Sequence, residues 1–108
     1  MQNLTFKGVL GITIEFVETE KKTKDEVELI DKLNSGEWTL LTAVPKPNFN
    51  KTHVNAFVNQ VSKHIVYNMA VHENNNFFAF IAMGKMSRNE VRRLKRELHI
   101  GKTLTQTK

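Results

Sequence analysis

The chain has 108 residues, of which 40% are hydrophobic, and a formal net charge of +5. This length and composition predict one globular domain with a single hydrophobic core rather than a disordered chain. The lack of cysteine excludes disulfide frameworks, thiol catalysis and thiolate metal sites. We expect no signal peptide, because the N-terminus lacks a basic region followed by an apolar one. We also expect no membrane partner, because the longest apolar run is far shorter than the roughly 20 residues that span a bilayer. The lack of cysteine fits a reducing compartment, and we expect a cytoplasmic location.

The first predicted element is a strand near the N-terminus. Apolar residues occupy alternate positions there, as in a strand with one buried face. Gly8 and Gly11 interrupt the pattern without changing its phase, so we expect a bend or bulge and not a reversal of the chain. The alternating residues are Leu4, Phe6, Leu10, Ile12, Ile14 and Phe16.

A helix is predicted next, beginning after Thr23. Thr23 and Glu26 have the spacing of a capping box, and Gly36 is a typical residue at a helix C-terminus. Val27, Ile30 and Leu33 follow at helical spacing. The alternation of Val27 and Leu29 leaves open a strand paired with residues 12–18. Residues 38–44 are predicted to form a further strand, which the prolines at 45 and 47 end.

A long helix is predicted from Asn50 to His72. Its apolar stripe has the three- and four-residue spacing of a helix packed on a core. The remaining positions are mostly asparagine, glutamine and serine with few charges, and this leaves open a homodimer formed through the helix. The stripe consists of Val54, Val58, Val61, Ile65 and Met69.

Residues 77–83 are apolar and aromatic at both odd and even positions, which indicates a strand covered on both faces. Ser87 and Glu90 then form a second predicted capping box, followed by a helix that Gly101 ends. The element order is therefore β-α-β-α-β-α. This order favours an α+β fold, or a small α/β fold, with a three-stranded sheet packed against helices; a parallel doubly wound sheet remains open. We expect one domain over residues 1–101 and a frayed basic tail over residues 102–108.

The charge of the chain is concentrated in its last quarter. All four arginines lie between Arg88 and Arg96, whereas the first 84 residues are close to neutral. Lysine and asparagine are abundant elsewhere, which is typical of AT-rich coding and suggests a low-GC bacterium or one of its phages or plasmids. Because arginine is scarce in such a composition, its clustering indicates a binding face.

Guanidinium groups suit bidentate contact with phosphates and carboxylates. We therefore expect a small, non-enzymatic regulatory protein that binds nucleic acid, DNA or RNA, through its last helix. The alternative is a protein interaction module or inhibitor of phage or plasmid type that binds an acidic partner with the same side chains. A helix-turn-helix is not expected, because the element before this helix is predicted to be a strand. The candidate residues are Arg88, Arg92, Arg93, Lys95, Arg96, His99 and Lys102.

The histidines suggest a third hypothesis, a small toxin-type ribonuclease assisted by His64, Tyr67 or His99. His53, His64 and Tyr67 would share one face of the long helix, with His64 close enough to Tyr67 for contact. His53 and His64 would be too far apart to bind one metal ion, so we expect neither a metal nor another cofactor. His72 is expected at the edge of the apolar stripe.

The carboxylates around residue 26 have no base near them in the sequence. We expect helix capping and solvation to account for Asp25, Glu26, Glu28 and Asp31. No catalytic residue is predicted.

Overall fold

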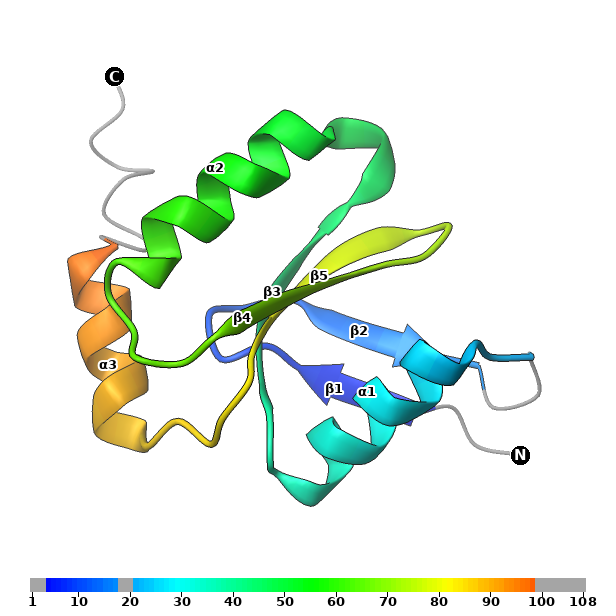
Figure 1. Cartoon of the computed structure of the whole chain (residues 1–108), viewed down its shortest axis with the longest axis horizontal. Helices are drawn as coiled ribbons and strands as arrows, with labels where there is room; N and C mark the ends of the chain where they lie inside the picture. Colours follow the sequence, from blue (N-terminus) through cyan, green and yellow to red (C-terminus); the bar gives the residue numbers. More distant parts are fainter. Residues whose placement is uncertain (1–3, 18–20, 99–108) are drawn as a thin grey trace.

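A three-stranded antiparallel sheet lies at the centre of the computed structural model, which describes residues 4–17 and 21–98 (Figure 1). The middle strand, β5 (Phe77–Ala82), pairs on one side with β3 (Thr39–Pro45) and on the other with β4 (Met69–Glu73). Residues 78–82 of β5 are all buried. The prediction that this strand is covered on both faces is therefore confirmed.

Each face of the sheet has its own hydrophobic cluster. On one face lie α2 (Lys51–Ser62) and α3 (Arg88–Glu97), which pack around Phe78 and Phe80. On the other face lie α1 (Lys24–Ser35) and a hairpin of β1 (Leu4–Lys7) and β2 (Thr13–Phe16). A short 3₁₀ helix, η1 (Lys46–Asn48), links β3 to α2. Figure 1 shows α1 and α2 on opposite sides of the sheet.

The α+β class and the three-stranded sheet are confirmed. The sheet is antiparallel throughout, and β5 directly precedes α3 in the chain, so neither a parallel doubly wound sheet nor a helix-turn-helix is present in the described residues. The helix predicted after Thr23 is also confirmed, and Gly36 ends it with a left-handed φ of 85°. In the described part of the chain no helix is long and apolar enough to cross a membrane.

The prediction of one bent strand at the N-terminus is wrong. The chain reverses, and β1 pairs with β2 in a register that places Phe6 opposite Ile14. The loop also crosses the edge of β3, because the N–H groups of Val9 and Leu10 donate to β3 carbonyl oxygens at 2.9 and 2.8 Å. Ile12, expected in the buried face, is 59% exposed.

The prediction of a helix from Asn50 to His72 is correct only for its first half. The helix α2 ends at Ser62, and residues 69–73 form β4. The physical reason is the central strand: without β4, β5 would expose a row of unpaired N–H and C=O groups along one edge. Pairing with β5 therefore outweighs the local helical spacing. The homodimer that we considered through this helix would have only residues 51–62 as a helical face.

The turn between β4 and β5 is an Asx turn, as its run of asparagines suggests. The side-chain oxygen of Asn74 accepts hydrogen bonds from the N–H groups of Asn76 and Phe77 at 2.8 and 3.0 Å. This turn fixes the register of the hairpin. The predicted end of the last helix at Gly101 and the tail at 102–108 lie outside the described residues.

We predict that Gly8→Ala destabilises the fold by about 1–3 kcal/mol. A Cβ atom on Gly8 would lie 2.5 Å from the carbonyl oxygen of Gly11 and 2.6 Å from that of Leu41, and backbone atoms cannot move aside as a flexible side chain can. Urea unfolding followed by the fluorescence of Trp38 measures the loss. Thr5→Ala, an exposed change in the same hairpin, is the control and should cost little. Unchanged stability of Gly8→Ala would show that the loop is free to leave β3.

Candidate nucleic-acid interface

The helix α3 begins at a complete capping box, as the sequence predicts. The hydroxyl of Ser87 accepts from the N–H of Glu90 at 3.1 Å, and the Glu90 carboxylate accepts from the N–H of Ser87 at 2.7 Å. Leu94 and Leu98 are buried in the cluster beneath the helix, and Val91 is half-buried beside them. This narrow apolar stripe leaves most of the helix surface facing outward.

A tyrosine holds the N-terminal end of α3. The Tyr67 hydroxyl lies 3.0 Å from both carboxylate oxygens of Glu90 and 3.2 Å from the carbonyl oxygen of Lys85. The tyrosine ring lies against Gly84, where an added Cβ atom would be 2.2 Å from a ring carbon. The hydrogen bond from the Ser87 N–H, and then that from Tyr67, lower the pKa of Glu90. The hydrogen bond to Glu90 in turn raises the pKa of Tyr67.

A histidine holds the C-terminal end of α3. His64 Nδ1 lies 2.9 Å from one oxygen of Glu97, and Arg93 Nε lies 3.1 Å from the other. The hydrogen bond from Arg93 is the largest cause of the lowered pKa of Glu97, and the charge and hydrogen bond of His64 act in the same direction. Both acidic side chains of α3 are therefore engaged, each with a residue of the segment between α2 and β4.

The remaining charged side chains of α3 are all cationic and exposed. Arg88, Arg92, Lys95 and Arg96 form no ion pair with any residue that the structure describes. Arg93 differs, because it pairs with Glu97 although its side chain is 70% exposed. The predicted candidates thus divide into four unpaired cations and one paired cation. His99 and Lys102 lie outside the described residues.

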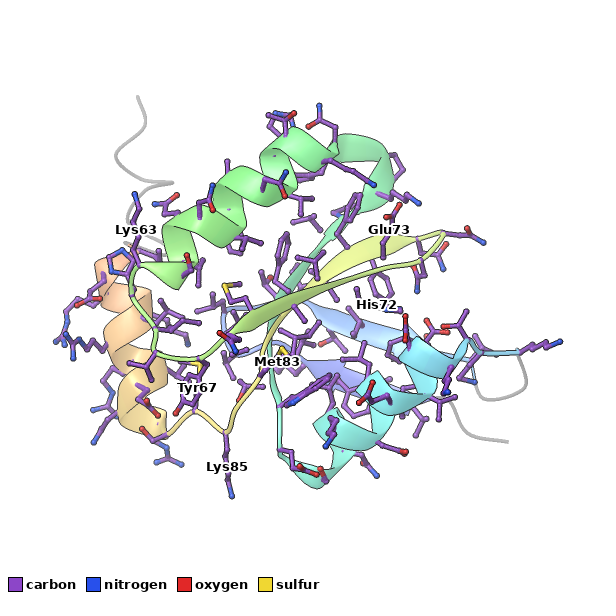
Figure 2. The ribbon with its side chains drawn as sticks, viewed as in Figure 1. Lys63, Tyr67, His72, Glu73, Met83 and Lys85 are labelled. Atoms are coloured by element: carbon purple, nitrogen blue, oxygen red, sulfur yellow. The ribbon has the colours of Figure 1, made fainter. Side chains whose placement is uncertain are left out.

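Two further lysines lie at the ends of this surface. Figure 2 shows Lys63 near the C-terminal end of α3 and Lys85 in the connection that leads into its N-terminal end. Both side chains are exposed. The charges of these two lysines were visible in the sequence, but the place of Lys63 beside α3 depends on the end of α2 at Ser62. We name the surface of α3 and these two lysines the α3 surface.

The histidine cluster expected on the long helix is not formed, because the helix ends before His64. His64 contacts Glu97 and Tyr67 contacts Glu90, two positions that are about 10 Å apart along α3. His53 packs its ring edge-to-face with Phe49 at 5.9 Å. The hypothesis of a ribonuclease site on one helix face therefore loses its geometric basis.

The expectation that Glu26 has no base near it is wrong. His72, on β4, places Nε2 3.0 Å from a Glu26 oxygen, and both side chains are 14% exposed. Thr23 caps α1 by accepting from the N–H of Glu26 at 3.1 Å, but the Glu26 carboxylate binds His72. The pair ties α1 to the sheet at the side of a cavity of about 620 Å³. Glu26 and His72 are 46 positions apart, and no local pattern in the sequence predicts a contact between them.

Within residues 4–17 and 21–98, no three histidine, aspartate or glutamate side chains converge as metal ligands. Comparison of the chain with models of protein families, with curated proteins and with solved structures gave no match. The charge and geometry of the described residues therefore provide the basis for a functional proposal.

We predict that stability falls at acid pH partly through Glu90 and Glu97. The pKa values of both carboxyl groups are lowered in the folded protein. Their contribution to the free energy of unfolding is therefore fully present above the ordinary carboxyl pKa of 4.5, and it is lost as the pH falls through the lowered pKa values. The variant Glu90→Gln/Glu97→Gln should therefore show a shallower loss of stability below about pH 4.5. Urea unfolding at a series of pH values measures this slope.

Glu28→Gln, an exposed change on α1, should keep the wild-type slope. An acid slope that is the same in the double variant and the wild type would contradict the assignment of these two carboxylates.

Proposed function

We propose that this protein binds nucleic acid through phosphate contacts made by the α3 surface. The observation that carries the proposal is the division of charge on α3. Its two carboxylates bind Tyr67 and His64, while four exposed cationic side chains have no anionic partner among residues 4–17 and 21–98. Solvent-exposed cations that are not neutralised locally create a field that attracts a polyanion.

The spacing of the arginines suits a row of phosphates. Arg88, Arg92 and Arg96 are four residues apart, so they follow one another at about 6 Å and span about 12 Å of the helix axis. Guanidinium groups contact phosphate oxygens through two hydrogen bonds, which ammonium groups do not do. The row therefore presents three bidentate donors in a line.

The anchoring of α3 supports the same proposal. The helix is held at its first turn by Tyr67, at its last turn by His64 and between them by Leu94, which is 1% exposed. A helix fixed in this way does not have to be ordered when it binds, and so more of the interaction energy appears as affinity.

The α3 surface is suited to the sugar-phosphate backbone and not to the bases. The helix contains no aromatic side chain on which an unpaired base could stack. Phosphate contacts fix position but carry no sequence information. We therefore propose a non-enzymatic regulator with weak sequence preference. The alternative partner, an acidic protein surface, would be recognised by selectivity among partners and by apolar anchors.

We predict that the protein binds a labelled duplex in fluorescence anisotropy and that affinity falls about 100-fold between about 50 and about 200 mM salt, as four phosphate contacts require. Arg88→Ala/Arg92→Ala/Arg96→Ala should reduce the log–log salt slope by about 2 to 3. Single-stranded DNA and RNA, measured in parallel, should bind with shallower slopes.

The matched control is Lys7→Ala/Lys24→Ala/Lys51→Ala, which removes three exposed positive charges from other elements. It should bind nearly as the wild type does if the local row, and not net charge, is responsible. Equal losses in the two triple variants would contradict a localised site. No binding to any of the three nucleic acids at the lower salt would end the proposal and direct attention to an acidic protein partner.

We predict that two neighbouring arginines contribute unequally to the salt dependence of binding. Arg92 has no ion pair with a described residue, whereas Arg93 is paired with Glu97. Arg92→Ala should therefore lower the salt slope by about 0.9, and Arg93→Ala should lower it by clearly less. The same titrations measure both variants, which have identical net charge. A larger loss for Arg93→Ala would show that the ion pair with Glu97 opens on binding.

A further inference from the structure

The strand β4 forms an open edge of the sheet. It pairs with β5 only, and no other strand in the described part of the chain lies beside it. The opposite edge, β3, is partly covered by the loop that contains Val9 and Leu10. In the three-stranded sheet, the β4 edge therefore has backbone groups that no other described strand pairs with.

The hydrogen bonds at the two ends of the hairpin show which groups face outward. Asn68 accepts from the N–H of Met83 at 2.8 Å, and Asn74 donates to the carbonyl oxygen of Phe77 at 3.1 Å. In an antiparallel pair, residues bonded to the partner alternate with residues whose N–H and C=O groups point away. Positions 70 and 72 therefore bond to β5. Met69, Val71 and Glu73 direct their backbone groups outward.

A groove of about 460 Å³ runs beside this edge, between α1 and β4. Its apolar lining includes Leu29 of α1, Ala70 of β4, Ile81 of β5 and Trp38. Leu29 and Ile81 are each 3% exposed or less, so the floor belongs to the rigid core. An extended segment paired with β4 would place alternate side chains over this floor.

The charge of the groove is acidic. Asp25 and Glu28 line it, are exposed and form no ion pair among the described residues. Glu73 also lines it and is paired with Lys46, outside the lining. The groove is lined by no lysine or arginine. Its two unpaired carboxylates favour a ligand with positive charge.

We propose that the edge of β4 and the adjoining groove bind an extended, basic segment of another protein by strand addition. The segment's backbone would pair with the outward groups at positions 69, 71 and 73. On the face of the segment that is turned toward α1, apolar side chains would lie over Leu29 and Ile81, and lysine or arginine side chains would reach Asp25 and Glu28. This surface shares no residue with the α3 surface.

A second copy of this chain does not fit the edge as well. Two β4 edges paired around a twofold axis would bring the same acidic side chains of both copies toward each other. Asp25 and Glu28 of the two copies, which lack ion-pair partners among the described residues, would repel each other. The occupant is therefore assigned as a basic segment and not as a symmetric partner.

The test uses hydrogen exchange measured by NMR on the full-length protein, with a synthetic peptide of roughly nine residues, long enough to pair along β4. The peptide carries valine and lysine in turn on one face and threonine on the other, so that both valine and lysine reach the groove. In the free protein the amides of Met69, Val71 and Glu73 should exchange quickly. Saturating peptide should protect these three amides and leave Ala70 and His72, already bonded to β5, unchanged. Protection without this alternation, or no protection, would overturn the proposal.

Variants separate the backbone contribution from the charge contribution. Val71→Pro removes only an outward N–H and should weaken peptide binding at least about 10-fold, whereas Val71→Thr should not. Asp25→Asn/Glu28→Gln should weaken binding roughly fivefold, and Asp31→Asn, on the same helix but outside the groove, should leave it unchanged. Equal binding by Val71→Pro and the wild type would overturn strand addition.

Two peptide controls keep the test decisive if Val71→Pro does not fold. A peptide that is N-methylated at the alternate residues whose N–H groups face β4 should lose binding to the wild-type protein, because those residues can no longer donate hydrogen bonds to β4. The same peptide with glutamate in place of each lysine should bind at least about 10-fold more weakly; equal binding would overturn the charge assignment. Concentration-dependent self-association that protects positions 69, 71 and 73 without peptide would show a second copy as the occupant and refute the proposal.

Discussion

The structure depends on the burial of β5. Residues 78–82 are buried, with Phe78 and Phe80 directed to the cluster under α2 and α3, and Ala79 and Ile81 to the cluster under α1. A strand buried in this way must find backbone partners on both sides, since an unpaired N–H or C=O group in the core costs about 1–3 kcal/mol. Residues 39–45 and 69–73 therefore form the two strands that pair with β5. The helices cover the two faces of the resulting sheet.

The elements that the sequence predicts correctly have local signals at their ends. Ser87 with Glu90 marks the start of α3, and Gly36 marks the end of α1 with a conformation that most residues avoid. These signals involve residues only a few positions apart, so they are visible in a single sequence. The α+β class and the sheet of three strands follow from such elements together.

The two errors in the predicted secondary structure arise where a local pattern fits two structures. Val61, Ile65 and Met69 have helical spacing, but only Val61 is in α2, and Met69 begins β4. The demand of β5 for a second neighbour decides between the alternatives, and that demand is not local. In the N-terminal hairpin, even positions pair with even positions, as Phe6 does with Ile14, so the alternation survives the reversal of the chain.

The candidate site was predictable to the extent that it consists of exposed charge. Arg88, Arg92 and Arg96 need no partner to be recognised in a sequence, because their clustering and their helical spacing are both visible. The partners of the carboxylates were not predictable. Tyr67, His64 and His72 all belong to the segment expected to continue the long helix, and each binds an acidic residue distant in the chain.

The segment from His64 to Glu73 thus determines both surfaces. Its first part holds α3 through His64 and Tyr67, and its second part is β4, whose outer edge borders the acidic groove. The cationic helix and the groove lie on opposite faces of the sheet, because α3 and α1 belong to different hydrophobic clusters. Because the sheet separates the two charged surfaces, neither neutralises the other, and the proposed polyanion and the proposed basic segment would not compete for the same residues.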